Sequence, residues 1–284
     1  MALIVNTNVA SLNAQRNLSA TQLGMSRVLS HLSSGLRITS ASDDAAGLAI
    51  SESLKAQIRS TAQAERNSND GISISQVAEG ALEQVGNLLT RMHELAVESA
   101  NGTLDTNSHN YLNNEFDSLR KEIDRIAAVT QFNNKNLLDG TLSGGVTMQV
   151  GINNSVNDVI TLAISNIQSV NIGSGGSSTQ FLGAAAIDTQ TNSQTALATL
   201  DQALTQISAS RAGLGALQNR LQVTIANLST ANENLSAANS RIRDVDVASE
   251  TAALTRFQIL SQAGIAVLAQ ANQLPSAALA LLKG

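Results

Sequence analysis

The 284-residue chain is long enough for two ordinary domains, but its composition excludes most classes of binding site. Charged residues make up 14%, aromatic residues 2%, and there is one proline and no cysteine, so aromatic-walled pockets, base-stacking platforms, disulfides and thiolate metal sites are excluded. The formal net charge of -5, without a cluster of Lys and Arg, argues against nucleic-acid binding.

The N-terminal segment, residues 1–42, carries three arginines and no acidic residue. Apolar residues near its end repeat at intervals of three and four, which predicts an amphipathic helix. These residues are Met25, Leu29, Leu32 and Leu36. The basic, Ser- and Asn-rich composition is also typical of an organellar transit peptide, which is kept as an alternative. Polar residues at 6–8 interrupt the apolar start and argue against a cleavable secretory signal.

Two further helices are predicted after this segment. Ser42-Asp43-Asp44 offers a capping side chain and two carboxylates to the start of the first helix, and Asn101-Gly102 is a stop signal after its end. The first helix carries the stripe Val85, Leu88, Met92, Leu95 and Ser99. The second follows cap candidates at 106–108 and carries the stripe Leu112, Phe116, Leu119, Ile123 and Ile126.

The period of the apolar residues changes to strict alternation between residues 146 and 164. The alternating residues are Val146, Met148, Val150 and Ile152, then Ile160, Leu162 and Ile164. With a turn signal at 153–155, this pattern predicts one β-hairpin. Residues 165–194 hold a single charge and a Gly- and Ser-rich run, so we expect an exposed loop region there.

Residues 197–242 give the strongest pattern in the chain, an unbroken heptad seam. Every seventh position is Leu or Ile: Leu200, Ile207, Leu214, Leu221, Leu228, Leu235 and Ile242. A helix across this seam is roughly 65–70 Å long, against a diameter of about 50 Å for a compact globule of this length. The sequence therefore predicts a mainly α protein, an elongated antiparallel helical bundle or coiled-coil rod with one small β-hairpin.

Residues 257–282 contain no charge and repeat apolar residues at helical spacing. The seam candidates are Phe257, Leu260, Val267, Leu274 and Leu281. Seven Gln, Asn or Ser residues and Pro275 argue against a membrane span. We expect the two terminal helices to pair into a narrow hairpin that is unstable in the single chain and orders when chains associate. An ordinary intramolecular hairpin is the alternative.

No constellation of residues points to catalysis, so an enzyme is not predicted and no cofactor or metal is expected. His31, His93 and His109 lack the spacing of a metal site, and the sequence after His93 begins like a zinc-protease motif without its second histidine. The Gly-rich run at 173–176 follows no buried strand and opens no helix, so it does not predict phosphate binding. What remains is surface for other copies or other proteins.

Motifs in order from both ends resemble those of the bacterial flagellin family over nearly the whole chain. The N-terminal ones are Ile4-Val-Asn-Thr-Asn8, Ser11-Leu-Asn-Ala-Gln-Arg-Asn-Leu18, Leu32-Ser-Ser-Gly-Leu-Arg-Ile38 and Ser42-Asp-Asp-Ala-Ala-Gly-Leu-Ala-Ile-Ser51. The C-terminal ones include Gln218-Asn-Arg-Leu221, Asn234-Leu-Ser-Ala-Ala238, Ser240-Arg-Ile-Arg-Asp244 and Leu268-Ala-Gln-Ala-Asn-Gln273. The gap at 165–194 leaves no room for large outer domains, so the resemblance is to a short, core-only flagellin.

The resemblance implies a structural subunit that self-assembles into the extracellular filament of the bacterial flagellum and serves motility. It implies that residues 1–42 and 244–284 form a paired-helix inner tube, and that residues 43–164 and 195–243 form the surrounding rod, with the hairpin at about 146–164. It also implies type III export and, as partners, other copies, junction and cap proteins and an export chaperone. No nucleic acid and no membrane span are expected.

In many members of that family the vertebrate innate-immune flagellin receptor reads the first rod helix. The positions that match here are Arg91, Leu95 and Glu115, while Thr90 and His93 replace commoner residues. These side chains also have an alternative role in packing between subunits. A hook–filament junction protein is the alternative function, and a secreted coiled-coil adhesin or needle protein would explain the heptads but not the terminal motifs.

Overall fold

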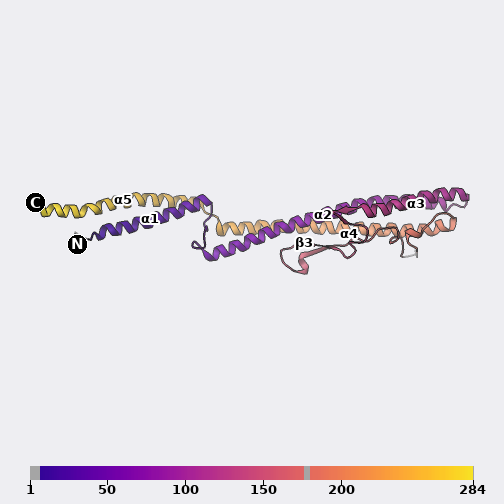
Figure 1. The fold of residues 1–284 in the computed structure, drawn as a ribbon, viewed down its shortest axis with the longest axis horizontal. Coiled ribbons are helices and arrows are strands. Elements are labelled where there is room, and N and C mark those ends of the chain that lie inside the picture. Colours follow the sequence, from indigo (N-terminus) through magenta and orange to yellow (C-terminus); the bar gives the residue numbers. More distant parts are fainter. Residues whose placement is uncertain (1–6, 176–179, 284) are drawn as a thin grey trace. The chain divides into compact units, whose positions relative to one another are not determined.

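The computed structural model describes residues 7–175 and 180–283, and the side chains among them up to residue 273. This part of the chain contains five α-helices and two short antiparallel strand pairs (Figure 1). The helices are α1 (Val9–Ser34), α2 (Ala45–Ser99), α3 (Thr106–Val129), α4 (Gln190–Arg243) and α5 (Val247–Lys283). The strands are β1 (Gln131–Phe132), β2 (Lys135–Asn136), β3 (Val146–Gln149) and β4 (Val159–Leu162). The predicted mainly α fold class is confirmed.

The chain divides into two compact units, and the long helices α2 and α4 contribute to both. The terminal unit comprises residues 1–58 and 233–284, and the central unit comprises residues 59–232. The terminal unit therefore includes the first turns of α2 and the last turns of α4, beyond the segments that the sequence assigned to the inner tube. A continuous helix of 54 residues such as α4 extends about 81 Å, so the seam lies on a single helix as expected.

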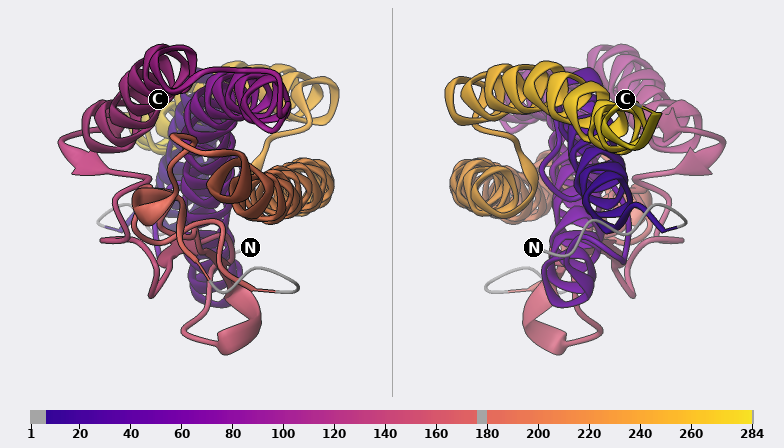
Figure 2. Two further views of the ribbon diagram at one scale, coloured as in Figure 1. Left: turned by 90° about the vertical axis from the view of Figure 1, so that its right-hand side faces the viewer. Right: turned by 90° about the vertical axis from the view of Figure 1, so that its left-hand side faces the viewer.

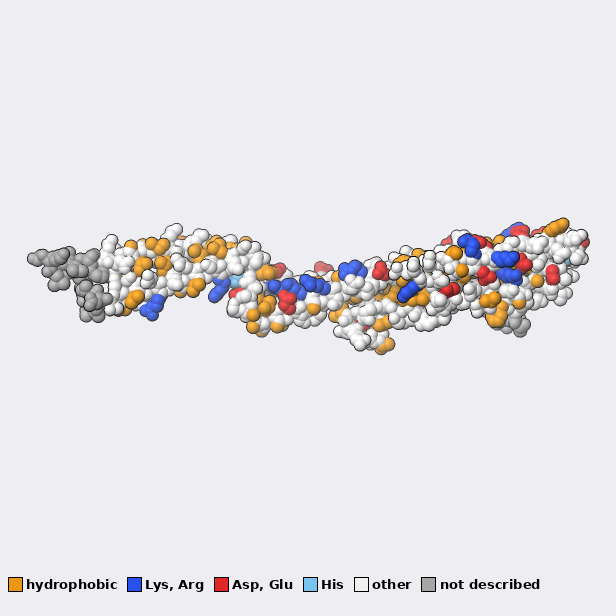
Figure 3. Space-filling model, viewed as in Figure 1, with side chains coloured by type: hydrophobic (Ala, Val, Ile, Leu, Met, Phe, Trp, Pro, Cys, Tyr) orange, Lys and Arg blue, Asp and Glu red, His pale blue; other side chains and the backbone are white. Residues whose placement is uncertain are grey.

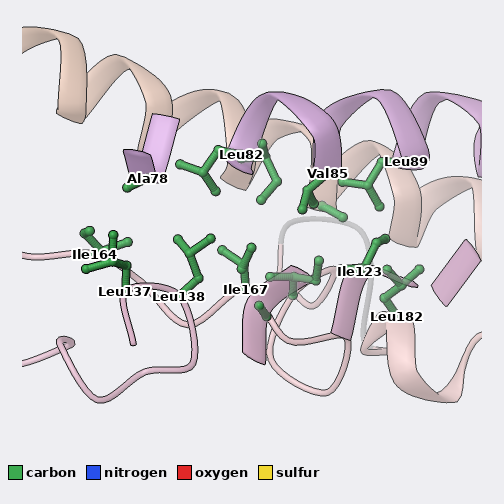
Figure 4. Packing of buried hydrophobic residues seen from close by; sticks show 14 of the residues in the cluster. Ala78, Leu82, Val85, Leu89, Ile123, Leu137, Leu138, Ile164, Ile167 and Leu182 are labelled. Carbon is green, nitrogen blue, oxygen red and sulfur yellow. The ribbon is translucent and has the colours of Figure 1, made fainter. Parts of the chain in front are cut away.

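The core of the central unit lies between α2, α3, α4 and the irregular chain around them. Figure 2 views the helices end-on and shows α2, α3 and α4 bundled, with the β3–β4 hairpin projecting from one side. On α2 the fully buried residues are spaced four and three apart, which keeps them on one helix face. They include Ala78, Leu82, Val85, Leu89 and Met92. Figure 4 shows this face opposite Leu137, Leu138, Ile167 and Leu182.

Before α4, the described residues of segment 165–194, which are 165–175 and 180–189, have no helix or strand apart from a 3-10 turn at Leu182–Ala184. The prediction that this segment is exposed is wrong. Its apolar side chains Ile167, Ile172, Leu182 and Ile187 are all buried in the core of the central unit. Helix α3 holds the segment in place through its polar side chains. Asp124 accepts hydrogen bonds from both the amide and the hydroxyl of Ser169, at 2.7 and 2.8 Å. Irregular spacing hid these core residues from a search for periodicity.

The predicted hairpin is present as β3 and β4, which pair from Val146 opposite Leu162 to Gln149 opposite Val159. Its inward residues include Met148, Val150, Ile160 and Leu162, as the alternation predicted. The strands are shorter than expected, because the chain leaves the ladder at Val150. The amides of Val150 and Gly151 both bond to the carbonyl of Asp158, and a 3-10 turn at Val156–Asp158 completes the connection.

A second strand pair, β1–β2, was not predicted. Asn133 and Asn134 connect the two strands, with φ of 48° and 60°. Two consecutive residues in the left-handed region make the tight turn that suits the twist of a two-residue hairpin, and asparagine tolerates it better than most residues. Each strand has only two residues, so no alternation exists from which the pair could be predicted.

The start of α2 confirms the helix start predicted at residues 42–44. The amide of Gly47 donates to Oδ1 of Asp44 at 2.8 Å, which makes Asp44 the capping residue. Its neighbour Asp43 instead organises the turn that precedes the helix, by accepting hydrogen bonds from Thr39 and Ser40. Helix α3 is capped by Asp105, which accepts from the amide of Ser108 at 2.9 Å, one residue before the candidates at 106–108.

Candidate functional site

Helices α1 and α5 of the terminal unit pack along each other (Figure 1). Phe257 and Gly264 lie seven residues apart on the face of α5 that meets α1. The ring of Phe257 lies against Gly24, and the side chain of Leu18 lies against Gly264. Near the other end of the pair, the side-chain amide of Asn8 donates to the carbonyl of Ala271 at 2.7 Å. Large and small residues thus alternate across the pair.

Among the described side chains, only one side of each terminal helix is covered in this pair, and part of the predicted seam lies outside that side. Phe257 is half-buried against α1, but Leu260 and Val267 are 47% and 58% exposed. The positions that follow Phe257 and Gly264 on the covered face are Ser261 and Leu268, four residues on rather than three. Sequence spacing did not separate these two choices, because both satisfy helical periodicity.

On α1, too, part of the predicted seam lies outside the contact between the two helices. Leu29 is 48% exposed, and its neighbour Val28, at 6%, takes the covered position. Leu32 and Leu36 are half-buried, in agreement with a seam at this end of α1. The side chains of Leu274 and Leu281 lie outside the described residues.

The uncovered sides of both terminal helices are rich in large apolar side chains. Those that are at least 47% exposed are Val9, Leu12, Leu23, Leu29, Val247, Ile259, Leu260, Ile265 and Val267. Figure 3 shows hydrophobic side chains over the terminal helices with few charges among them. Such a concentration of exposed apolar side chains is typical of an interaction surface.

A partly buried polar pair interrupts the apolar contacts between α1 and α5. Nδ1 of His31 lies 2.8 Å from Oε1 of Glu250, and His31 is only 8% exposed. A polar pair at such a position favours one register, because a slipped register would leave the buried His31 without its partner.

The heptad seam of α4 is covered along its first half and opens toward its end. Leu200, Ile207, Leu214 and Leu221 are buried in the core of the central unit. Leu228, Leu235 and Ile242 are half-buried. Polar residues at the interleaved positions pair with α2: Gln218 donates to Glu79 at 2.9 Å, and Asn239 accepts from Ser51 at 2.7 Å. The seam positions therefore serve mainly the contact of α4 with its own chain.

The receptor-binding candidates divide into an exposed ion pair and a buried core residue. The guanidinium of Arg91 on α2 donates to Oε1 of Glu115 on α3 at 2.9 and 3.0 Å, and also to Glu94 at 3.0 Å. The hydrogen bonds that Arg91 donates to Glu94 and then to Glu115 raise its pKa. Leu95 is 1% exposed and belongs to the core, so it cannot offer a surface to a receptor on the folded chain.

A buried polar cluster at the α2–α3 turn was missed by the sequence analysis. The hydroxyl of Ser99 donates to the carbonyl of Ile187 at 2.5 Å, and its oxygen lies 2.7 Å from Nδ1 of His109. Because the serine proton is used, Nδ1–H of His109 is the donor to Ser99. The nearby Asp105 has a lowered pKa, mainly through its hydrogen bonds with Ser108. The cluster ties α2, α3 and the segment just before α4 together, and its serine is too buried for catalysis.

The described residues offer no arrangement suited to catalysis or metal binding. A groove of about 700 Å³ lies between α4 and residues 161–172, but Arg220 is the one charged residue that lines it. Among residues 7–175 and 180–283, no group of three His, Asp or Glu side chains could hold a metal ion. By length and composition alone, the part of α5 at 247–273 could cross a membrane, with a mean hydropathy of 1.3. No residue in the most apolar 18-residue window of that segment is buried in the described part of the chain.

Comparison with known proteins explains why the notable features of this chain are exposed surfaces and not a cleft. The family model for the bacterial flagellin N-terminal helical region matches residues 5–143, and the model for the bacterial flagellin C-terminal helical region matches residues 197–282. A flagellin from Halalkalibacterium halodurans is 48% identical over 281 residues, which are 99% of this chain and 100% of the relative. The chain belongs to the bacterial flagellin family.

Two further similarities fit a flagellin. The flagellar filament 33 kDa core protein of Treponema phagedenis is 40% identical over 290 residues, which cover 99% of this chain and all of that protein. A flagellar hook-associated protein from Vibrio parahaemolyticus has a similar structure, with a TM-score of 0.59 and 16% identity. It covers 71% of this chain and 100% of its own. At that identity the likeness shows the fold alone and does not favour the junction function.

Family membership confirms the main functional expectation from the sequence. This flagellin is a structural subunit of the extracellular flagellar filament and not an enzyme. It is a short flagellin, since it aligns with full-length relatives over nearly its whole length and has no large domain between the hairpin and α4.

Proposed function

We propose that this flagellin polymerises by burying the uncovered apolar side chains of α5 and α1 against other copies. The observation that carries the proposal is the exposure of Leu260 and Val267, which lie seven residues apart on α5 and are 47% and 58% exposed. Ile259 and Ile265 extend the apolar surface around the helix. Fully burying such a side chain stabilises the buried state by about 1.5–3 kcal/mol, so a few of them in every subunit favour assembly strongly.

Two separate stripes on α5 support a position between two neighbours. One stripe, with Phe257 and Gly264, meets α1 of the same chain. The other, with Leu260 and Val267, lies to one side of it and has no cover within the chain. A helix with apolar residues on several sides is stable when it is surrounded. This supports the inner-tube role that the family resemblance implies for residues 244–284.

We also propose that the order of the terminal pair depends on assembly. Within α1 only Ala14, Val28 and His31 are buried. Glycine and serine occupy several of the facing positions, so the pair gains little from apolar burial to offset the entropy of ordering two long helices. Amide hydrogen exchange on the monomer tests this: fast exchange in α1 and α5 supports it, and protection equal to that of α2 would favour an ordinary stable hairpin.

The assembly proposal is tested by replacing Leu260 and Val267 together with glutamine. Seeded polymerisation would be followed by sedimentation and negative-stain electron microscopy. We expect no filaments from Leu260→Gln/Val267→Gln and normal filaments from the matched apolar variant Leu260→Met/Val267→Ile. Unchanged circular dichroism would show that the helices of the monomer persist. Normal filaments from the glutamine variant would overturn the proposal.

Arg91 and Glu115 favour a second role, as a ligand of the vertebrate innate-immune flagellin receptor. Their ion pair bridges α2 and α3 and leaves each side chain nearly half exposed, at 49% and 45%. Such a rigid, charged feature suits recognition by a folded receptor. Leu95 is assigned to the core that supports this surface and not to the contact itself.

A reporter-cell assay tests the receptor role with monomeric protein. We expect Arg91→Ala to weaken activation, whereas Arg125→Ala, which breaks a similar exposed ion pair with Glu122 on α3, should leave it unchanged. An unchanged dose response for Arg91→Ala would contradict the assignment.

The remaining partners proposed for this flagellin use the same terminal helices. Junction and cap proteins would contact them at the ends of the filament, and an export chaperone would cover apolar residues near the C-terminus before type III export. The exposed side chains of α5 support these proposals, because a single chain leaves them in water. Pull-down of each purified partner with the Leu260→Gln/Val267→Gln variant, compared with the unmodified chain, tests them.

A further inference from the structure

The outer face of α1 carries a repeat of basic side chains that apolar contacts between copies do not explain. Leu12 is followed four residues later by Arg16, and Leu23 is followed four residues later by Arg27. The two Leu–Arg pairs are eleven residues apart, which is three turns of helix, so all four side chains lie on one face. Leu12 is 50% exposed, Leu23 is 69% exposed, and both arginines are exposed.

This face points away from α5. The covered positions of α1 include Ala14, Leu18 and Val28, which lie on the opposite side of the helix. A shallow hollow on the outer side is lined by Val9, Leu12 and Arg16, together with two small or polar neighbours. Apolar and basic side chains therefore stand next to each other on one continuous surface.

The charge around this face is basic, although the whole chain is acidic. Helix α1 contains Arg16 and Arg27 and no acidic residue. The charged residues at 247–273 of α5 are Arg256 and Glu250. Three arginines and one glutamate give a net charge of +2 with histidine neutral, against -5 for the full chain. Glu250 already bonds to His31. Within the described residues of α1 and α5, a second copy thus offers this face no other side-chain carboxylate, and Asp246 immediately before α5 is bonded to the first amides of that helix.

We propose that the unassembled subunit binds the surface of an anionic lipid bilayer through this face of α1. Leu12 and Leu23 would enter the boundary between headgroups and acyl chains. The aliphatic parts of Arg16 and Arg27 would lie beside them, with their guanidinium groups at the lipid phosphates. Helices that combine basic and apolar side chains on one surface bind anionic membranes in this way.

The proposal is for a helix that lies on the bilayer and does not cross it. It uses α1, whereas the apolar segment of α5 and the stripe of Leu260 and Val267 lie elsewhere on the pair. The Leu260→Gln/Val267→Gln test of assembly leaves this face of α1 intact, so the two proposals are tested by different substitutions. Assembly would compete with lipid binding only where neighbouring copies cover α1.

Co-sedimentation of the full-length monomer with vesicles tests the proposal, at protein concentrations below those that support polymerisation. The probes are vesicles of phosphatidylglycerol mixed with phosphatidylcholine and vesicles of phosphatidylcholine alone. We expect binding to the anionic vesicles that weakens with added salt. Arg16→Gln/Arg27→Gln should lower the partition coefficient about 25-fold, about five-fold for each arginine.

Two controls separate this effect from general charge and from folding. Arg59→Gln/Arg66→Gln removes two exposed arginines from α2 and should leave binding unchanged. Arg16→Lys/Arg27→Lys retains the charge and should restore it. Equal binding to both vesicle types, no binding, or equal binding by the glutamine variant would overturn the proposal. A glutamine variant that binds vesicles normally but fails to polymerise would identify a second copy as the occupant of this face instead.

Discussion

The ring of Phe257 on α5 lies so close to Gly24 on α1 that a Cβ at residue 24 would stand 2.7 Å from two ring carbons. Leu18 and Gly264 repeat the relationship with the helices exchanged, at 3.3 Å. Glycine inside a helix costs about 1 kcal/mol relative to alanine, so its presence at both positions has a packing reason. The two glycines allow the terminal helices to interlock.

Replacing Gly24 with valine is expected to weaken the α1–α5 pair by about 1–3 kcal/mol, because the new side chain must displace the Phe257 ring. Hydrogen exchange of α1 and α5 amides in the assembled protein measures the loss. Gly80→Val is the matched control, since a Cβ at Gly80 on α2 meets no atom within 4 Å. The interpretation fails if the α1 amides are equally well protected from exchange in both variants.

Gly71 on α2 is expected to be equally intolerant, for a different contact. A Cβ there would lie 2.3 Å from the sulfur of Met148, the residue through which the β3–β4 hairpin rests on the helix. Gly71→Ala should lower the free energy of unfolding of the central unit by about 1–3 kcal/mol, measured by urea titration. Adding Met148→Ala should remove most of this extra cost, because the two residues are in contact. Strictly additive losses of unfolding free energy from the two substitutions would contradict this interpretation.

Ser99→Ala is expected to destabilise the α2–α3 turn. The change leaves Nδ1–H of His109 without its partner and the carbonyl of Ile187 with only the longer bond from Ser193, at 3.4 Å. Losing the partner of a buried polar group costs about 1–3 kcal/mol. Ser73→Ala on the exposed side of the same helix should change the free energy of unfolding by less than about 0.5 kcal/mol. Urea titration of both variants measures the difference, and similar values would show that the Ser99 cluster adds no stability.

Long periodic elements of this fold could be predicted from the sequence, and short irregular ones could not. The seam from Leu200 to Leu221 repeats often enough that its helix and its burial follow from spacing alone. The pair β1–β2 has four strand residues, and its turn depends on two asparagines with positive φ. Ile167 and Ile187 follow no period, and their burial depends on a groove that only the packed helices of the central unit create.

The sequence predicted that the terminal helices carry apolar interaction surfaces, but not which residues form them. Spacing indicated an apolar stripe on α5, but whether Leu260 or Ser261 meets α1 depends on the rotation of the helix about its axis. The close contact of Phe257 with Gly24 belongs to that rotation and is not encoded in the periodicity of either helix. Leu95 shows the same limit on α2, because it was predicted as a receptor contact but its helix face turns into the core.

Acid should loosen the turn between α1 and α2 through Asp43. Hydrogen bonds, first from the Thr39 hydroxyl and then from the Ser40 amide, lower the pKa of Asp43 from 3.8 to about 2. A folded-state pKa below the unfolded value means that the carboxylate stabilises the fold above pH 3.8, and that this contribution is lost as pH falls toward about 2. The turn should therefore keep its structure at neutral pH and lose it only in strong acid.

Asp43→Asn removes the titrating group and tests the sign of this effect. The difference in unfolding free energy between the unmodified chain and Asp43→Asn should be constant above pH 5 or so and shrink as the carboxylate protonates. NMR titration of the Asp43 carboxyl carbon measures its pKa directly, and Asp70→Asn, at an exposed position of α2, controls for loss of one charge. A difference that grows with falling pH, or a carboxyl that titrates at its ordinary value, would show that Thr39 and Ser40 do not hold the carboxylate in solution.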